Sequence, residues 1–288
     1  MFTYEALTTR NIGFVTEEEQ AKLRDATVFV CGTGGMGGAV IMALARAGLG
    51  RLLIADIDEF EVSNLNRQVF CTIETVGRHK AEATRDACLK INPEMQIEVY
   101  HGDWADHVTE LVAQSVIVVN GTDDLGASLL LYRTARAGGK AVVDAYASPL
   151  PSVYVTPPDG TDHETRLGYP TIGTDWDKLT GLQRQAAFQR EAEYVLIHSS
   201  SRHHIDLDMA GQVAAGRRSR MSFAPMVLST GMLMAYEVIA AILDKQTATD
   251  ARGWFFNPHR ARVEHPRPAW LAALLRPVIR RVLARMMA

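Results

Sequence analysis

A glycine-rich turn between an apolar run and a helical stretch constrains this fold more than any other feature of the chain. The apolar run Thr27–Cys31 leads into seven residues, 32–38, of which five are glycine, and the helical pattern Met36–Leu49 follows. Glycines between a strand and a helix let backbone N–H groups approach a phosphate at the helix N-terminus. The glycines expected to face the phosphates are Gly32, Gly34, Gly35 and Gly37. The turn therefore predicts a nucleotide site at the edge of a parallel sheet.

Strands and helices continue to alternate beyond this turn. Further strands are predicted at Leu52–Ile54, Gln96–Tyr100, Val116–Asn120 and Lys140–Asp144, and helices at Arg78–Ile91, Ala105–Ala113 and Leu125–Ala137. Five strands joined by helices predict an α/β fold: a doubly wound, Rossmann-like, mostly parallel sheet with helices on both faces.

The second half of the chain has a different character. The pattern predicts a strand at Ser152–Thr156, a Pro- and Gly-rich insertion at 157–180, a helix at Leu182–Ile197, a polar segment interrupted by glycine at 199–216, an apolar helix at Pro225–Leu243, and a hairpin of Trp254–Phe256 and Arg262–Glu264. We therefore divide the chain into an N-terminal arm and helix (1–25), a main domain (26–265) and a C-terminal amphipathic basic helix (266–288).

The C-terminal helix carries both apolar and basic residues. A helical projection puts Leu271, Leu274, Leu275, Val278 and Val282 on one face, with Arg276, Arg280, Arg281 and Arg285 around the rest. This pattern favours a helix that docks on the core or on a partner subunit, and it leaves open a contact with a membrane surface or RNA.

Charge and cysteine content narrow the class of protein. With 30 Lys and Arg against 33 Asp and Glu, the formal net charge is −3, so no global basic field exists and we predict no DNA partner. Three cysteines form no disulfide framework and favour a reducing cytoplasm, and no secretory signal stands at the N-terminus. The stretch Phe223–Leu243 is long enough to cross a bilayer, but its Pro, Ser, Thr and Gly residues favour a buried helix.

Charged and amide side chains follow the ends of two predicted strands. After the second strand come Asp56, Asp58, Asn64, Asn66, Arg67 and Gln68, then Lys80; after the fourth comes Asp123. Arg and Lys at this edge of the sheet can neutralise a triphosphate, and a carboxylate there can hold Mg²⁺. The set suits attack by a carboxylate on the α-phosphate of ATP, with pyrophosphate leaving.

These motifs resemble the ThiF/MoeB/HesA group of ubiquitin-activating-enzyme-like adenylyltransferases. The resemblance runs from about Arg10 to Arg262 and rests on the glycine turn, Asp56–Gln68, Lys80 and the Thr122-Asp123 pair. It identifies the main domain as a ThiF-like adenylyltransferase domain that uses ATP. It implies that Asp56 binds the ribose, that Asn64, Arg67 and Lys80 bind the phosphates, and that Asp123 binds the magnesium. The segment Arg10–Gly13 resembles the arginine segment that enters the partner subunit's site in this family's dimers.

Cysteine positions depart from the family pattern. Many relatives carry two Cys-x-x-Cys pairs for structural zinc and a catalytic Cys in the second half, but no cysteine follows Cys88 here. A four-cysteine zinc site and a late catalytic Cys are therefore excluded. His198, His203 and His204 with Asp206 and Asp208 are expected to form exposed polar loop rather than a metal site. The insertion at 157–180 and the basic cluster at 217–220 are expected to face the acyl substrate.

The resemblance implies a cytoplasmic, zinc-free, homodimeric adenylyltransferase that uses Mg-ATP to make an acyl-adenylate. The carboxylate is expected at the C-terminus of a ubiquitin-like or sulfur-carrier protein, or on a peptide. A tRNA-attached acid, as in the threonylcarbamoyladenosine dehydratases, is less favoured because the chain has no general basic balance. Two other classes stay open: an NAD(P)-dependent Rossmann oxidoreductase, and a nucleotide-binding scaffold without catalysis.

Overall fold

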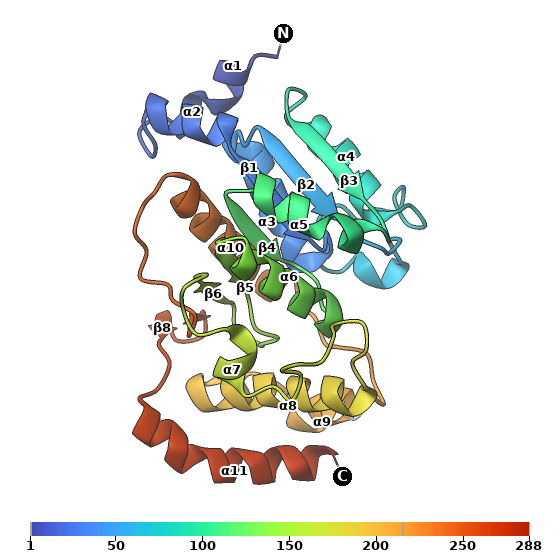
Figure 1. The fold of residues 1–288 in the computed structure, drawn as a ribbon, viewed down its shortest axis with the longest axis vertical. Coiled ribbons are helices and arrows are strands. Elements are labelled where there is room, and N and C mark those ends of the chain that lie inside the picture. Colours follow the sequence, from blue (N-terminus) through green and yellow to red (C-terminus); the bar gives the residue numbers. More distant parts are fainter. Residues whose placement is uncertain (1, 215, 288) are drawn as a thin grey trace.

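The computed structural model describes residues 2–214 and 216–287, and in that part of the chain eight strands form one sheet (Figure 1). The strands are β1 (Thr27–Cys31), β2 (Arg51–Ala55), β3 (Gln96–Tyr100), β4 (Ile117–Asn120), β5 (Val142–Asp144), β6 (Ser152–Thr156), β7 (Trp254–Asn257) and β8 (Arg262–Glu264). Their order in the sheet is β3-β2-β1-β4-β5-β6-β7-β8. The strand order reverses between β1 and β4, which makes their carboxyl ends the expected place for a ligand.

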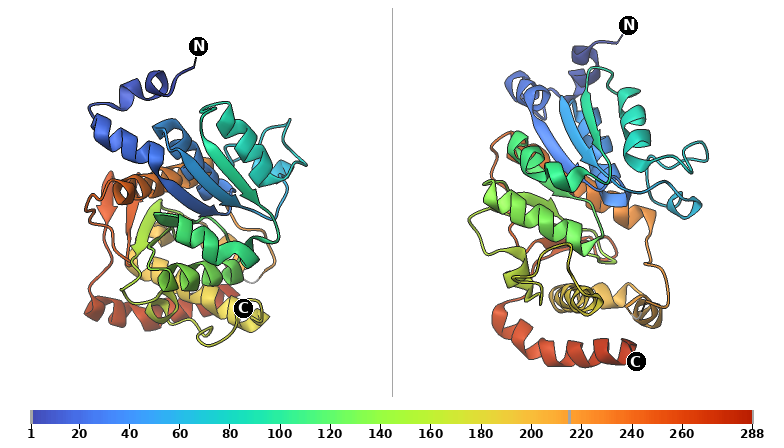
Figure 2. Two further views of the ribbon diagram at one scale, coloured as in Figure 1. Left: turned by 45° about the horizontal axis from the view of Figure 1, so that its top comes forward. Right: turned by 45° about the vertical axis from the view of Figure 1, so that its right-hand side comes forward.

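Helices cover both faces of this sheet (Figure 2). They are α1 (Tyr4–Thr8), α2 (Glu17–Asp25), α3 (Gly35–Ala47), α4 (Lys80–Leu89), α5 (Trp104–Gln114), α6 (Leu125–Ala137), α7 (His163–Leu167), α8 (Gly181–His198), α9 (Leu207–Ala214), α10 (Ala224–Ile242) and α11 (Ala269–Met287), with short 3-10 turns η1 (Thr9–Asn11), η2 (Val62–Asn64) and η3 (Ser201–His203).

Strand pairing confirms the predicted fold class. The first five strands pair in parallel, while β6, β7 and β8 extend the sheet in antiparallel fashion. The five predicted parallel strands and the predicted closing hairpin are all present, with ends that differ by a residue or two.

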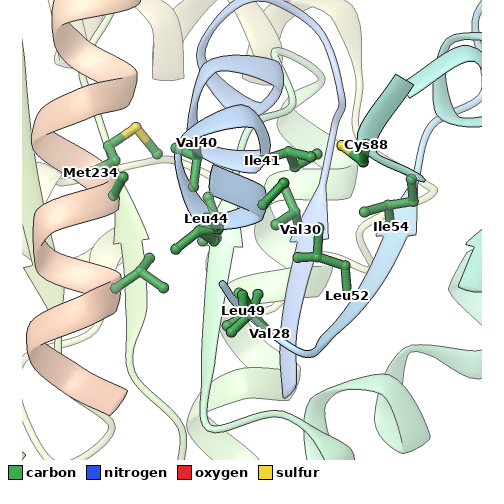
Figure 3. Close-up of a cluster of buried hydrophobic side chains, with 14 of the residues drawn as sticks. Val28, Val30, Val40, Ile41, Leu44, Leu49, Leu52, Ile54, Cys88 and Met234 are labelled. Atoms are coloured by element: carbon green, nitrogen blue, oxygen red, sulfur yellow. The ribbon is translucent and has the colours of Figure 1, made fainter. Parts of the chain in front are cut away.

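The alternation of side chains along β1 places one hydrophobic core on each face of the sheet. Val28 and Val30 point into the core under α3, α4 and α10, while Phe29 and Cys31 point into the core under α5 and α6. Figure 3 shows the first core, with Met234 of α10 packed against α3. The helix α10 is long and apolar enough to cross a membrane, but in this protein it packs against α3 and 44% of its most apolar stretch is buried.

Two segments predicted as loops contain ordered structure. The insertion at 157–180 includes α7, and Arg133 of α6 anchors it through an ion pair with Glu164 and hydrogen bonds to the carbonyls of Thr171 and Thr174. The segment at 199–216 includes η3 and α9, and Ser199 and Ser201 are buried. These hydroxyls hydrogen-bond one another, and the N–H of Ser200 donates to Glu264 of β8. Of the side chains expected to be exposed here, His203, Asp206 and Asp208 are exposed, while His198 and His204 are partly buried.

The predicted apolar face of the C-terminal helix is also corrected. Ala272, Ile279 and Leu283 form the buried side of α11 and pack with Ile197 of α8. Leu274 and Val278, assigned to the docking face from the sequence, are exposed instead. Apolar residues occur nearly all around this helix, so the docking partner, and not the sequence alone, selects the buried side.

Candidate nucleotide and carboxylate site

The glycine turn leaves space for a ligand at the N-terminus of α3. Gly32 has φ +91°, and a Cβ on it would lie 2.5 Å from the carbonyl carbon of Gly121, so only glycine fits between the ends of β1 and β4. Gly34 is the N-cap of α3, and no side chain in the described part of the chain caps it. The first N–H groups of the helix can therefore bind an anion, and the helix dipole favours negative charge there.

Asp56 connects the end of β2 to this turn. Its Oδ2 accepts hydrogen bonds from the backbone N–H of Thr33 (2.7 Å) and from the Thr33 hydroxyl (3.0 Å), and its Oδ1 accepts one from the N–H of Asp58 (3.0 Å). The carboxylate thus fixes the position of the turn. The carboxylate is half-buried and directly follows β2, as expected. Its contact with a ribose stays a prediction.

Lys80 places a nearly buried positive charge at the same edge. It is the first residue of α4, its side chain is 11% exposed, and its Nζ lies 2.8 Å from Oδ2 of Asp58. Asp58 was expected to contact the nucleotide, and in the structure it holds the ammonium group. The ion pair with the exposed Asp58 carboxylate orients the Lys80 side chain at this edge.

The loop after β2 supports a second cation. Arg67 donates hydrogen bonds to the carbonyl of Ser63 (3.0 Å) and to Oδ1 of Asn66 (2.9 Å), and it forms no ion pair with any carboxylate in the described residues. A Cβ added to Gly35, on the first turn of α3, would lie 3.9 Å from the Arg67 Cγ. The guanidinium charge is therefore unneutralised beside the candidate anion site.

The three amide side chains of this loop have different surroundings. Asn64 is buried, and its Oδ1 caps η2 by accepting from the N–H of Glu61 (3.1 Å), while Asn66 donates to the carbonyl of Ser222 (3.0 Å) just before α10. Gln68 lies beside Gly34, and its buried Oε1 has no hydrogen-bond partner among the described residues. An unpartnered buried acceptor beside the turn fits a site completed by a ligand or water.

Asp123 lies just beyond β4 and is largely exposed. Its Oδ2 is 3.8 Å from the Nη1 of Arg220, and the neighbouring Asp124 caps α6 and pairs with Arg184 of α8 at 2.7 Å. Arg220 also lies over the ring of Phe188, 5.6 Å from its centroid. Arg220 of the cluster at 217–220 thus lies beside the predicted magnesium ligand, and α8 contacts the adjacent Asp124. Sequence patterns gave no sign of the contact with Arg184.

Arg10 lies far from the glycine turn of its own chain. The arm is attached at the other end of α3, where Tyr4 donates to the carbonyl of Gly48 (2.6 Å) and Asn11 to that of Ala47 (3.2 Å). The 13 residues of α3 separate the two ends by about 20 Å at the usual helical rise. The structure therefore does not bring Arg10 together with the other candidate residues of the same chain.

A buried polar network that the sequence analysis missed lies behind the end of β5. One carboxylate oxygen of Asp144 accepts hydrogen bonds from Asn120, Tyr132 and Tyr154 at 2.7–2.9 Å, and burial raises the pKa of Asp144 to about 7. The guanidinium of Arg166 lies 5.5–5.9 Å from three tyrosine rings. The sequence did contain a signal for this network, because Asp144 ends an apolar strand just as Asp56 follows one.

The described residues contain no group of three or more His, Cys, Asp or Glu side chains that could hold a metal ion. His204 stacks on His259 at 4.4 Å, and Nδ1 of His198 accepts from the N–H of Arg267. A cavity of about 230 Å³ beside His198 and β8 is separate from the strand ends that carry the candidate site. A magnesium ion at Asp123 would therefore need phosphate oxygens and water among its ligands.

Comparison with known proteins places the site within a protein family. The ThiF family matches residues 8–270. The molybdopterin-synthase adenylyltransferase of Salmonella typhimurium is 41% identical over 114 residues, which are 39% of this chain and 45% of that protein. The chain spans less than half the length of the curated relatives it matches.

Solved structures share the fold. E. coli MccB, solved with ATP, superposes with a TM-score of 0.61 at 20% identity and covers 87% of this chain and 67% of its own. E. coli tRNA N6-threonylcarbamoyladenosine dehydratase, TcdA, gives 0.58 at 19% identity and covers 83% of this chain and 95% of its own.

Proposed function

The chain belongs to the ThiF family, and from that membership and the residues at the strand ends we propose that it is an ATP-dependent adenylyltransferase. In this reaction a carboxylate oxygen of the substrate attacks the α-phosphorus of ATP. The bond from that phosphorus to the bridging oxygen breaks, and pyrophosphate leaves with its electron pair. The products are an acyl-adenylate and pyrophosphate.

One observation carries the proposal: the uncapped N-terminus of α3 shares one edge of the sheet with the residues that follow β2 and β4, which include two cations and one exposed carboxylate. Lys80 and Arg67 come from the chain after β2, and Asp123 from the end of β4. A hydride-transfer site has little use for two cations and a metal-binding carboxylate at this edge. The set therefore supports ATP chemistry over the oxidoreductase alternative.

Each side chain has a role that follows from its charge. The α3 N–H groups and Arg67 would bind phosphate oxygens, and Lys80 would neutralise the charge that develops on the leaving pyrophosphate. Asp58 keeps the Lys80 ammonium in place before the triphosphate shares it. Asp123 would hold Mg²⁺, which when bound shields the phosphate charge. Asp56 would accept hydrogen bonds from the ribose hydroxyls.

The substrate we propose is the C-terminal carboxylate of a ubiquitin-like or sulfur-carrier protein, or a carboxylate of a peptide. Relatives are named molybdopterin-synthase adenylyltransferase and ubiquitin-like modifier-activating enzyme 5, and MccB was solved with MccA. These names support the substrate class. We further propose that the protein is a zinc-free homodimer in a reducing compartment. The three unpaired, buried cysteines support the reducing compartment.

Magnesium-dependent exchange of labelled pyrophosphate into ATP, measured with candidate carrier proteins and peptides, tests the proposal. Lys80→Ala and Asp123→Ala are each expected to lower exchange by about two orders of magnitude or more, because each removes charge stabilisation specific to the transition state.

Matched control variants can be made on α4, which carries Lys80, and on α5, the next helix in the sequence. Lys90 lies exposed at the other end of α4, and Asp106 is exposed on α5. Lys90→Ala and Asp106→Ala should leave exchange unchanged. Full exchange in Lys80→Ala and Asp123→Ala would overturn the assignment, and binding of NADH in preference to ATP would favour the oxidoreductase.

A further inference from the structure

The C-terminal helix α11 forms the outermost layer at one end of the molecule, beyond α8 and α9 and opposite the N-terminal arm (Figures 1 and 2). Its inner side is held by the packing of Ala272, Ile279 and Leu283 against α8 and by an ionic contact. Glu193 of α8 accepts both Arg276 (3.0 Å) and Arg280 (2.8 Å). Helix α11 is thus fixed in orientation, which determines what its outer side presents.

Three large apolar side chains line the outer side. Trp270, Leu274 and Val278 are 66%, 67% and 53% exposed. They are spaced by four residues, so they form one line along the helix, opposite the buried Ala272 and Ile279. These three side chains contribute little to the packing of the protein's own core. A contiguous line of exposed apolar side chains instead indicates a surface that binds a partner or a membrane.

The charge around this line has one sign. The residues of α11 include four arginines and no acidic residue. Glu193 neutralises part of the charge of Arg276 and Arg280, while Arg281 forms no ion pair within the described part of the chain and projects on the same side as Trp270. The outer side is therefore both apolar and cationic.

We propose that the outer side of α11 binds an anionic membrane surface, lying in the plane of the lipid head groups. Trp at the head-group level, Leu and Val in the acyl boundary, and Arg beside lipid phosphates are the interactions of interfacial helices. A second copy of α11 would oppose arginine to arginine, and a nucleic-acid backbone offers nothing to the apolar line. The proposal does not depend on the reaction at the strand ends.

Vesicle binding tests it. The full chain is floated with vesicles of phosphatidylcholine alone and with vesicles that contain phosphatidylglycerol. Binding is expected only to the anionic vesicles and should weaken as salt rises. Trp270→Ser/Leu274→Ser should lower the partition coefficient by about tenfold or more, because both apolar anchors are lost. Arg281→Glu should also lower it, since it reverses a charge at the surface.

The controls separate this contact from general stickiness and from misfolding. Ile172 and Leu182 are equally exposed but lie outside α11, so Ile172→Ser/Leu182→Ser should bind vesicles like the wild type. Thermal unfolding of the α11 variants should match that of the wild type, since the changed side chains are exposed.

Four results would overturn the proposal. They are no binding of the wild type to anionic vesicles, equal loss in the control variant, a dimer in light scattering that only the α11 changes dissociate, and preferential binding to RNA.

Discussion

At the scale of single residues, His163 shows how burial fixes a protonation state. Its ring stacks on Tyr132 at 4.4 Å, and its Nδ1 lies 3.2 Å from the Nη2 of Arg166, which can only donate. Burial, and then the charge of Arg166, lower the pKa of His163 from 6.5 to about 3. The imidazole is therefore neutral in the folded protein throughout the physiological range.

The neutral state of the buried His163 ring makes the free energy of unfolding depend on pH. Below pH 6.5 the unfolded chain takes up a proton at His163 that the folded protein refuses down to about pH 3, so stability falls as pH falls through this window. His163→Asn keeps an acceptor for Arg166 without titrating. We expect its unfolding free energy to fall less steeply with acid, by up to about 1.4 kcal/mol per pH unit. Urea unfolding at several pH values measures this slope.

His107 provides the control. Its ring is half exposed on α5, so His107→Asn removes an imidazole that is not buried and should not reproduce the change of slope expected for His163→Asn. An unchanged slope in His163→Asn would mean that the ring is protonated in the folded state or accessible to water.

The cysteines give a second prediction at this scale. All three are buried, and burial raises the pKa of Cys71 and Cys88, the latter to about 12. Thiolate is the reactive form, so maleimide should not label the native protein near neutral pH. Cys71→Ser should retain pyrophosphate exchange, and metal analysis should find no stoichiometric zinc. Rapid labelling, or loss of exchange in Cys71→Ser, would give Cys71 a role in the reaction.

At the scale of elements, the contact between α3 and α10 positions the glycine turn. A Cβ at Gly231 of α10 would lie 2.5 Å from the Cβ of Ala39 and 2.9 Å from the carbonyl oxygen of Met36 on the first turn of α3. Gly231→Val should therefore lower the unfolding free energy by about 2–3 kcal/mol, since overpacking outweighs the small gain in helix propensity. It should also weaken ATP binding, because α3 carries the turn.

The matched substitution is Gly181→Val. Gly181 begins α8, and a Cβ there meets nothing within 4 Å. Chemical denaturation and ATP titration of both variants measure the two effects. Equal stability of the two variants would show that α10 can shift without cost.

Elements were predictable from the sequence where a local pattern determines them. Helix α6 has the predicted ends because Asp124 caps its first turn and the apolar spacing runs to Ala137. The strands and the glycine turn follow from apolar runs bounded by turn residues. In the same way, most candidate site residues could be proposed from the sequence because they follow predicted strand ends.

Contacts between distant segments were not predictable. Arg184 reaches Asp124 across 60 residues, and Arg133 orders the insertion from another helix. The buried side of α11 depends on where Ile197 lies. No local periodicity encodes these pairings, because each depends on how the elements pack.

At the scale of the whole molecule, the position of the N-terminal arm suggests a role for Arg10. Arg10 is exposed on η1, near the end of α3 that lies away from the glycine turn. Phe14, four residues later, is 91% exposed. An exposed aromatic ring on an arm, beside an arginine that forms no ion pair among the residues the structure describes, suits insertion into a second copy of the chain. We propose that Arg10 supplies charge to the nucleotide site of that copy.

Mixing two inactive variants tests this arrangement. Arg10→Ala and Lys80→Ala dimers should each be weak. In a mixed dimer, the subunit with Arg10→Ala keeps its own Lys80 and receives Arg10 from its partner, so one site is intact and activity should return to about half that of the wild-type dimer. If Arg10 acted within its own chain, each subunit would keep its own lesion and mixing would restore nothing. Mixing Arg10→Ala with the Arg10→Ala/Lys80→Ala double variant is the control, since no intact site can form in either arrangement. Absence of recovery after verified subunit exchange, or a monomer in light scattering at the assay concentration, would remove Arg10 from the site.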